Sequence, residues 1–152
     1  MVQTTVEARR ELLDAVAQAT DALGLALASL GAAYEQLDEV RADELEERLF
    51  RPVQLAYGRA RRIHSGFAER HALASRSFEP PSPGLASIGV RGFIDNAVAA
   101  IGRADGAIVS LQDSLLPVEV GDPELRAALA ELRELVAGLA DRARELARTI
   151  GR

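Results

Sequence analysis

Residues 22–34 read ALGLALASLGAAY, and none of these thirteen side chains carries a charge. Around this stretch, apolar or small side chains recur at alternating steps of three and four residues, which is the spacing of a heptad seam. The seam consists of Leu13, Val16, Thr20, Leu23, Leu27, Leu30, Tyr34 and Leu37. The pattern predicts one long helix over residues 5–41. Ala and Gly flank the seam from position 17 to position 33, so neighbouring helices can approach its backbone closely.

The outward face of this helix indicates that the protein self-associates. Leu25, Ala28 and Ala32 fall where the surface of a helical bundle normally carries charge. A helix that is apolar on every side is buried on every side, and a single bundle covers only one of its sides. We therefore expect a homo-oligomer, with a dimer as the first guess, whose subunit interface contains these three side chains. The alternative is that alanine is abundant in this chain and is tolerated at its surface.

The same periodicity predicts three further helices, over residues 43–73, 88–115 and 123–150. Asp43 is a plausible cap for the second helix, and Pro52 predicts a kink or a break within it. Asp122 and Pro123 are typical of a helix start, because the first can cap and the second suits the first helical position.

Between the second and third helices, residues 76–87 contain three prolines and cannot be helical. We expect an ordered, extended crossover that Phe78 and Leu85 anchor on the helices. Four amphipathic helices joined by short turns and one moderate loop predict a single all-α domain over residues 1–152. The expected arrangement is an antiparallel up-down-up-down four-helix bundle with a long first helix.

Composition limits the class of protein. Ala, Leu, Arg and Glu supply more than half of the 152 residues, as in proteins built of long helices. The chain has no Cys, which excludes disulfides and thiolate chemistry, and its net charge is −5. A mildly acidic chain is not typical of nucleic-acid binding, and the longest uncharged helical stretch is shorter than the roughly 20 residues of a membrane span. We expect a cytoplasmic protein with neither a nucleic acid nor a membrane as its partner.

A polar stripe on the second helix is the first candidate site. Tyr57, His64 and His71 are seven residues apart, and Arg61 falls on nearly the same face. Arg and His side chains donate hydrogen bonds to carboxylate or phosphate, so the stripe predicts a small pocket for an anion or an acidic group. The alternative is a solvated boundary between the core and the surface.

The segment from Arg59 to His64 contains an Arg-x4-His pattern. It resembles the pattern of HEPN domains, a family of helical-bundle ribonucleases, over these six residues. This resemblance implies that Arg59 and His64 would be the catalytic pair, in a cleft at a dimer interface. Ala60 departs from the family, which often has a polar residue directly after the arginine.

We expect no metal and no cofactor. Six acidic side chains surround the first turn of the fold, but acidic residues at the start of a helix are typical of a solvated turn. They are Asp38, Glu39, Asp43, Glu44, Glu46 and Glu47. The leading interpretation is a non-enzymatic, self-associating interaction or adaptor module, with a possible further protein partner. The anion binder and the ribonuclease are the alternatives.

Overall fold

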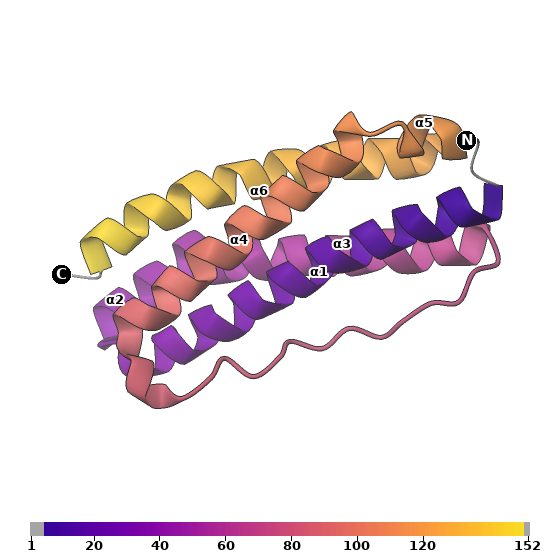
Figure 1. Ribbon diagram of the computed structural model, residues 1–152. Helices are drawn as coiled ribbons and strands as arrows, with labels where there is room; N and C mark the ends of the chain where they lie inside the picture. Colours follow the sequence, from indigo (N-terminus) through magenta and orange to yellow (C-terminus); the bar gives the residue numbers. More distant parts are fainter. Residues whose placement is uncertain (1–4, 151–152) are drawn as a thin grey trace.

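The computed structural model describes residues 5–150, which form helices and connecting segments with no strand among them (Figure 1). Four helices are long, as the periodicity predicts. The α-helices are α1 (Thr5–Gln36), α2 (Glu39–Leu45), α3 (Arg51–Arg70), α4 (Gly89–Asp113), α5 (Leu116–Val120) and α6 (Pro123–Ile150). A π-helical turn, η1 (Glu46–Phe50), joins α2 to α3, and a 3-10 turn, η2 (Ala86–Ile88), precedes α4.

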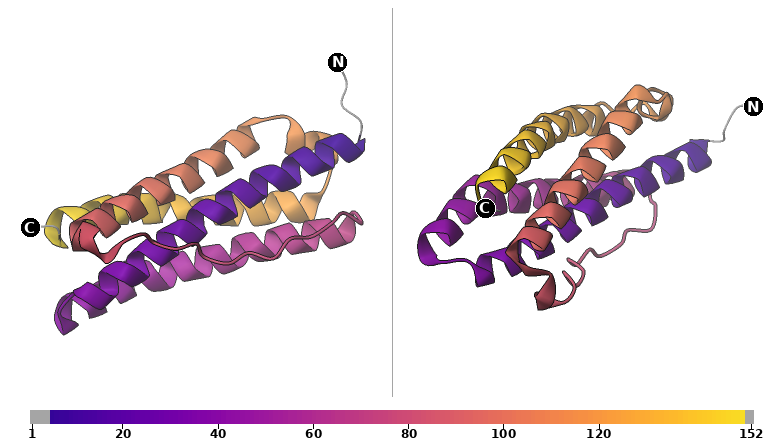
Figure 2. Two further views of the ribbon diagram at one scale, coloured as in Figure 1. Left: turned by 60° about the horizontal axis from the view of Figure 1, so that its bottom comes forward. Right: turned by 60° about the vertical axis from the view of Figure 1, so that its left-hand side comes forward.

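The four long helices pack in pairs that run antiparallel: α1 against α3 and α4, and α6 against the same two helices (Figures 1 and 2). Gln36 at the end of α1 donates a hydrogen bond to the Ala86 carbonyl just before α4, at 3.0 Å. At the other end of the molecule, Arg70 at the end of α3 pairs with Asp122, directly before α6. The chain therefore runs through α3 and α4 in the same direction.

The expected up-down-up-down order is therefore wrong at the third long helix. The segment between α3 and η2, residues 71–85, returns along the length of α1 instead of turning back at the end of α3 (Figure 2). Extended chain advances about 3.1 Å per residue and helix about 1.5 Å, so a crossover of this length outreaches α3. The predicted order requires a loop that joins adjacent ends of the second and third long helices. Hydrophobic periodicity does not indicate the path of a loop.

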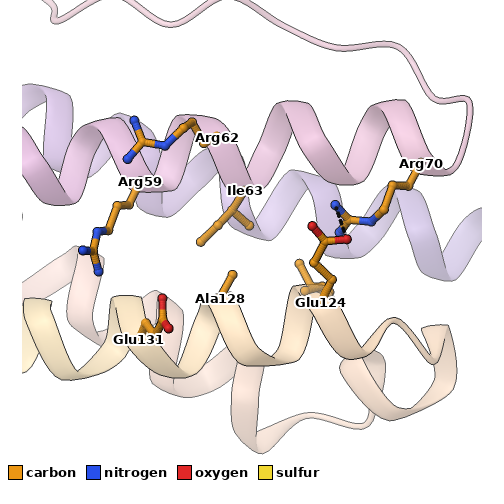
Figure 3. Close-up of a pocket in the computed structure, with 8 residues that line it drawn as sticks. Arg59, Arg62, Ile63, Arg70, Glu124, Ala128 and Glu131 are labelled. Atoms are coloured by element: carbon orange, nitrogen blue, oxygen red, sulfur yellow. Dashed lines mark ion pairs between the residues drawn. The ribbon is translucent and has the colours of Figure 1, made fainter.

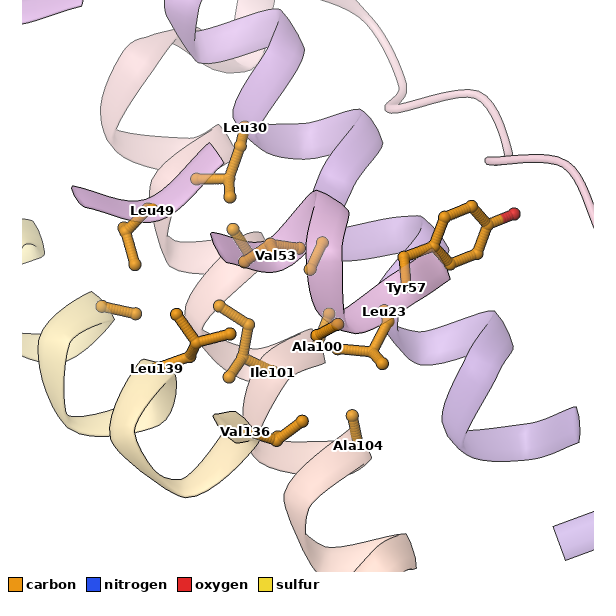
Figure 4. Close-up of a cluster of buried hydrophobic side chains, with 14 of the residues drawn as sticks. Leu23, Leu30, Leu49, Val53, Tyr57, Ala100, Ile101, Ala104, Val136 and Leu139 are labelled. Atoms are coloured by element: carbon orange, nitrogen blue, oxygen red, sulfur yellow. The ribbon is translucent and has the colours of Figure 1, made fainter. Parts of the chain in front are cut away.

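Helix α1 packs against α4 most extensively, and also against α3 and α5. Its buried side chains include Ala19, Ala26 and Ala33, and α4 also buries several alanines in the same core cluster. Small side chains of this kind allow two helix backbones to lie close together. Leucine, isoleucine and valine side chains from all four long helices fill the interior between them (Figure 4).

The first long helix ends at Gln36, five residues earlier than periodicity predicts. The Asp38 carboxylate accepts a hydrogen bond from the Arg41 backbone N–H at 2.9 Å and so caps a new helix, α2. Asp43, the expected cap, lies inside α2. Aspartate is a favourable N-cap residue at either position, so the sequence alone does not distinguish Asp38 from Asp43. The structure uses Asp38, where the chain turns away from α1.

The sequence predicts a kink or a break of the helix at Pro52. The irregularity in the structure is the π-helical turn η1, which ends two residues before this proline. There the Arg51 N–H donates to the carbonyl of Glu46, five residues back. Pro52 has no N–H to give to the Arg48 carbonyl four residues before it. Arg142 on α6 supplies a donor instead, since its Nη1 lies 3.0 Å from the Arg48 oxygen.

The crossover is anchored at one of the two expected places. Phe78 is buried, whereas Leu85 is 77% exposed, so the prediction for Leu85 is wrong. Near the middle of α1, Gly24 makes room for the segment: a Cβ there would lie 3.2 Å from Tyr57 Cε1 and 3.7 Å from Pro80 Cα. A larger side chain at this position would separate α1 from both.

Helix α1 is long and apolar enough to cross a membrane when length and composition alone are considered. Half of the residues in its most apolar window are buried against the rest of the chain.

We predict that Arg142 and Pro52 are energetically coupled through the Arg48 carbonyl. Arg142→Met should lower the free energy of unfolding by about 1 kcal/mol, because the carbonyl loses its donor. In a Pro52→Ala background the same change should cost less, since the new N–H can bond within the helix. Urea unfolding of the four proteins measures this coupling. Arg144→Met, which removes an arginine whose ion pair with Asp141 lies within α6, is the control. Equal costs of Arg142→Met in both backgrounds would contradict the prediction.

Candidate functional site

The structure divides the predicted stripe into two parts. Tyr57 and His64 lie beneath the crossover and are only 4% and 3% exposed, so they are not at a solvated boundary. Arg61 lies above Tyr57, with its guanidinium carbon 4.7 Å from the ring centroid. His71 follows the last residue of α3 and pairs with Asp122 instead.

Phe78 of the crossover covers His64. The two rings meet edge to face, with their centroids 4.9 Å apart. Arg76 lies over the outer face of Phe78 at 4.2 Å and also forms an ion pair with Asp21 of α1. The crossover is thus held by an aromatic contact in the interior and a charged contact at the surface.

Two polar atoms beneath the crossover have no hydrogen-bond partner in the described chain: the Tyr57 hydroxyl and Nδ1 of His64. Burial raises the pKa of Tyr57 above its ordinary value, because the phenolate would lose its hydration. Burial also lowers the pKa of His64, and the positive charge of Arg76 acts in the same direction. The imidazole beneath Phe78 is therefore held neutral.

Between α3 and the crossover lies a wide-open surface hollow of about 370 Å³, which we call the arginine cavity. Arg61, Arg62 and Arg76 line it, and no carboxylate does. The remaining lining consists of two hydroxyl-bearing residues, a glycine and the buried phenylalanine, namely Ser65, Ser77, Gly58 and Phe78. Guanidinium and hydroxyl donors around one cavity are the groups that bind carboxylate and phosphate.

A second groove, of about 400 Å³, lies between α3 and α6 (Figure 3). Its charges are mixed, since Arg59, Arg62 and Arg70 share it with Glu124 and Glu131, and Arg70 is ion-paired with Glu124 at 3.4 Å. A groove in which the guanidinium groups already face carboxylates attracts an anion less than the arginine cavity does.

Arg59 and His64, the pair implied by the HEPN resemblance, are not brought together within the chain. Arg59 lines the groove toward α6, whereas His64 lies beneath Phe78 of the crossover. The imidazole of His64 is also too deeply buried in this structure to meet a substrate.

His71 contributes to a helix cap. Its Nε2 lies 2.8 Å from Asp122 Oδ2, and Arg70 donates to the same oxygen at 3.0 Å. The other carboxylate oxygen accepts the Leu125 N–H at 3.0 Å, so Asp122 caps α6 as the sequence predicts. Burial alone would raise the pKa of Asp122, but these hydrogen bonds outweigh it and hold the pKa below its usual value. The second predicted histidine thus joins α3 to α6.

The three residues predicted for a subunit interface are each partly covered within one chain. Leu25, Ala28 and Ala32 are all half-buried, and Leu25 and Ala32 pack against the main core. On the same face of α1, Asp21 and Gln36 contact the crossover and the turn that follows it. The chain itself therefore supplies part of the cover that periodicity assigned to a second subunit.

Sequence reasoning missed most of the arginine cavity. Arg76, Ser77 and Phe78 lie in a segment without periodicity, and nothing in their spacing indicates that they meet α3. Arg62 follows Arg61 directly, so helical geometry points it away from the predicted stripe, and only the crossover makes the two arginines neighbours of one cavity.

No group of three or more His, Asp or Glu side chains within residues 5–150 is arranged to hold a metal ion. No family model, curated protein or solved structure compared with the chain matches it.

We predict that Asp122→Asn lowers the free energy of unfolding by about 1–2 kcal/mol at pH 7, because it removes the negative charge that pairs with Arg70 and weakens the hydrogen bonds to that oxygen. A carboxylate with a depressed folded pKa stabilises the protein above its unfolded pKa of about 3.9, and this stabilisation is lost as the pH falls through the folded value. The difference between wild type and variant should therefore narrow in acid. Asp113→Asn, at an exposed position, is the control, and a pH-independent difference would argue against the assignment.

We predict that His64 makes the protein less stable in mild acid. Its folded pKa is lowered, so the unfolded chain takes up a proton first, and the free energy of unfolding falls as the pH drops below about 6.5. The contribution cannot exceed about 1.4 kcal/mol per pH unit. His64→Phe should flatten this dependence between pH 7 and pH 5.5 in chemical unfolding, whereas an unchanged slope would show that His64 is not its source.

Proposed function

We propose that the protein binds a small anion, a carboxylate or a phosphate, in the arginine cavity. One observation carries the proposal: Arg61, Arg62 and Arg76 line a single cavity from two segments of chain, and no carboxylate shares that lining. In a protein of net charge −5, three arginines that line one cavity with no carboxylate in the same lining are a departure from the average surface.

Two of the three guanidinium groups are held in position by aromatic rings. Arg61 lies over Tyr57 and Arg76 lies over Phe78. A guanidinium stacked on a ring keeps its N–H groups free at its edges, where a planar or tetrahedral anion can accept two of them. Because the side chains are already ordered, less conformational entropy is lost when an anion binds.

Asp21 is the carboxylate that an anion would have to compete with for Arg76. Both side chains of this ion pair are about half exposed. Exposed ion pairs contribute little net stability, so a bound anion can share or replace the Asp21 contact. The hydroxyl groups of Ser65 and Ser77 are further donors in the same lining.

The proposal is one of binding and not of catalysis. The imidazole nearest to the cavity, that of His64, is enclosed beneath Phe78 and held neutral. Self-association through Leu25, Ala28 and Ala32 does not enter the proposal, because the chain itself already covers part of each residue.

We further propose that the arrangement is an antiparallel four-helix bundle with one long crossover, in a cytoplasmic protein. Support for the bundle comes from the four antiparallel pairs of long helices. Support for a core role of α1, and against a membrane span, comes from its buried window and from the pairing of Asp21 with Arg76.

We predict that inorganic phosphate raises the melting temperature of the wild type relative to chloride at equal ionic strength. At ten times the dissociation constant the stabilisation amounts to about 1.4 kcal/mol. Arg61→Met combined with Arg62→Met should abolish this shift, because two of the three cationic donors are gone. Thermal shift and calorimetric titration measure it.

Arg133→Met is the matched control, since Arg133 is an exposed arginine that hydrogen-bonds to Gln112 away from the cavity. The control should respond to phosphate as the wild type does. An equal phosphate shift in the double variant would refute the assignment of the anion site to the arginine cavity.

A further inference from the structure

We propose that the anion carries an aromatic ring, and that this ring takes the position that Phe78 holds in the present structure. This inference rests on the proposed anion site and names its ligand class: an aromatic carboxylate or an aromatic phosphate. Phe78 would then be an internal occupant of a ring site that a ligand can fill in its place.

Few contacts attach the crossover to the helices. Phe78 is the one buried residue between positions 72 and 89. Within the described chain, no backbone-to-backbone hydrogen bond joins residues 74–84 to another segment. The attachment of this stretch therefore depends on side chains, with Phe78 inside and Arg76 outside. A segment held in this way can release one ring without breaking any regular secondary structure.

The ring that Phe78 meets carries an unpaired polar atom. The His64 imidazole, which contacts the Phe78 ring edge to face, is more than nine-tenths buried, and its Nδ1 has no hydrogen-bond partner in the described chain. An unpaired buried polar atom is costly, and a phenylalanine ring has no group that can pair with it. A ligand ring that bears a polar substituent can pair where Phe78 cannot.

The position of the Phe78 ring is continuous with the arginine cavity. Phe78 itself lines the arginine cavity together with Arg61, Arg62 and Arg76. A ring in the place of Phe78 therefore directs an attached carboxylate or phosphate toward three guanidinium groups. One ligand would satisfy both halves of the site at once.

The contacts around Phe78 favour an aromatic ring over an aliphatic one. Arg76 lies over its face at 4.2 Å, and the edge-to-face contact with His64 has a centroid distance of 4.9 Å. Both arrangements depend on the quadrupole of a π system, which a saturated ring lacks.

Calorimetric titration with benzoate, cyclohexanecarboxylate and acetate tests the inference. We expect the wild type to bind benzoate more tightly than the other two. Phe78→Ala should raise the ratio of benzoate affinity to acetate affinity by about tenfold, because the internal ring no longer occupies the site. Leu85→Ala, an exposed change in the same crossover, should alter neither affinity.

The histidines provide a direct readout, since the chain has only two. A benzoate ring beside His64 should shift its imidazole NMR signals and leave those of His71 in place. Circular dichroism shows whether Phe78→Ala folds. If it does not fold, the NMR spectrum of the wild type with benzoate and titration of a Phe78→Leu variant test the ring site instead. We expect Phe78→Leu also to bind benzoate more tightly, because it removes the competing aromatic contacts.

Equal binding of benzoate and cyclohexanecarboxylate, or unchanged His64 signals at saturating benzoate, would overturn the inference. If phosphate still stabilised the protein through Arg61 and Arg62, the anion site itself would stand and only the ring site would be wrong. Loss of every anion effect would instead overturn the proposed function.

Discussion

The close packing around α1 is the constraint on which the rest of the structure depends. Its alanines sit in one core cluster with those of α4, and Gly24 leaves room for both Tyr57 and the crossover. Because so little side chain projects from this part of α1, an extended segment can lie along the helix and still reach α3 with Phe78 and Arg76. The arginine cavity exists only where that segment approaches α3.

Much of the secondary structure was predictable because it depends on local physics. Hydrophobic periodicity located the four long helices, and Asp122 acts as the cap that its place before Pro123 implies. The path of the chain was not predictable in this way. The sequence of residues 71–85 is compatible with a loop at the end of α3 or with an extended crossover along α1. Tertiary contacts that local sequence patterns do not encode decide between the two paths. That choice reversed the direction of the third long helix.

The candidate site was predictable only in its helical half. Tyr57, Arg61 and His64 share a face of α3 because of helical geometry, which sequence spacing captures. Arg76 and Phe78 reach the same place through tertiary packing alone. Spacing also grouped His71 with the others, although its nearest charged partner lies 51 positions away at the start of α6. Periodicity thus identifies a shared face, whereas the residues opposite that face decide what each side chain does.

The hydrogen bond from Arg142 to the Arg48 carbonyl has a consequence for the order in which the protein forms. The donor is made 94 residues after the acceptor. While the protein is being synthesised, this carbonyl therefore faces water until α6 has left the ribosome and docked. The start of α3 is complete in sequence long before this hydrogen bond can form, because α6 supplies the donor.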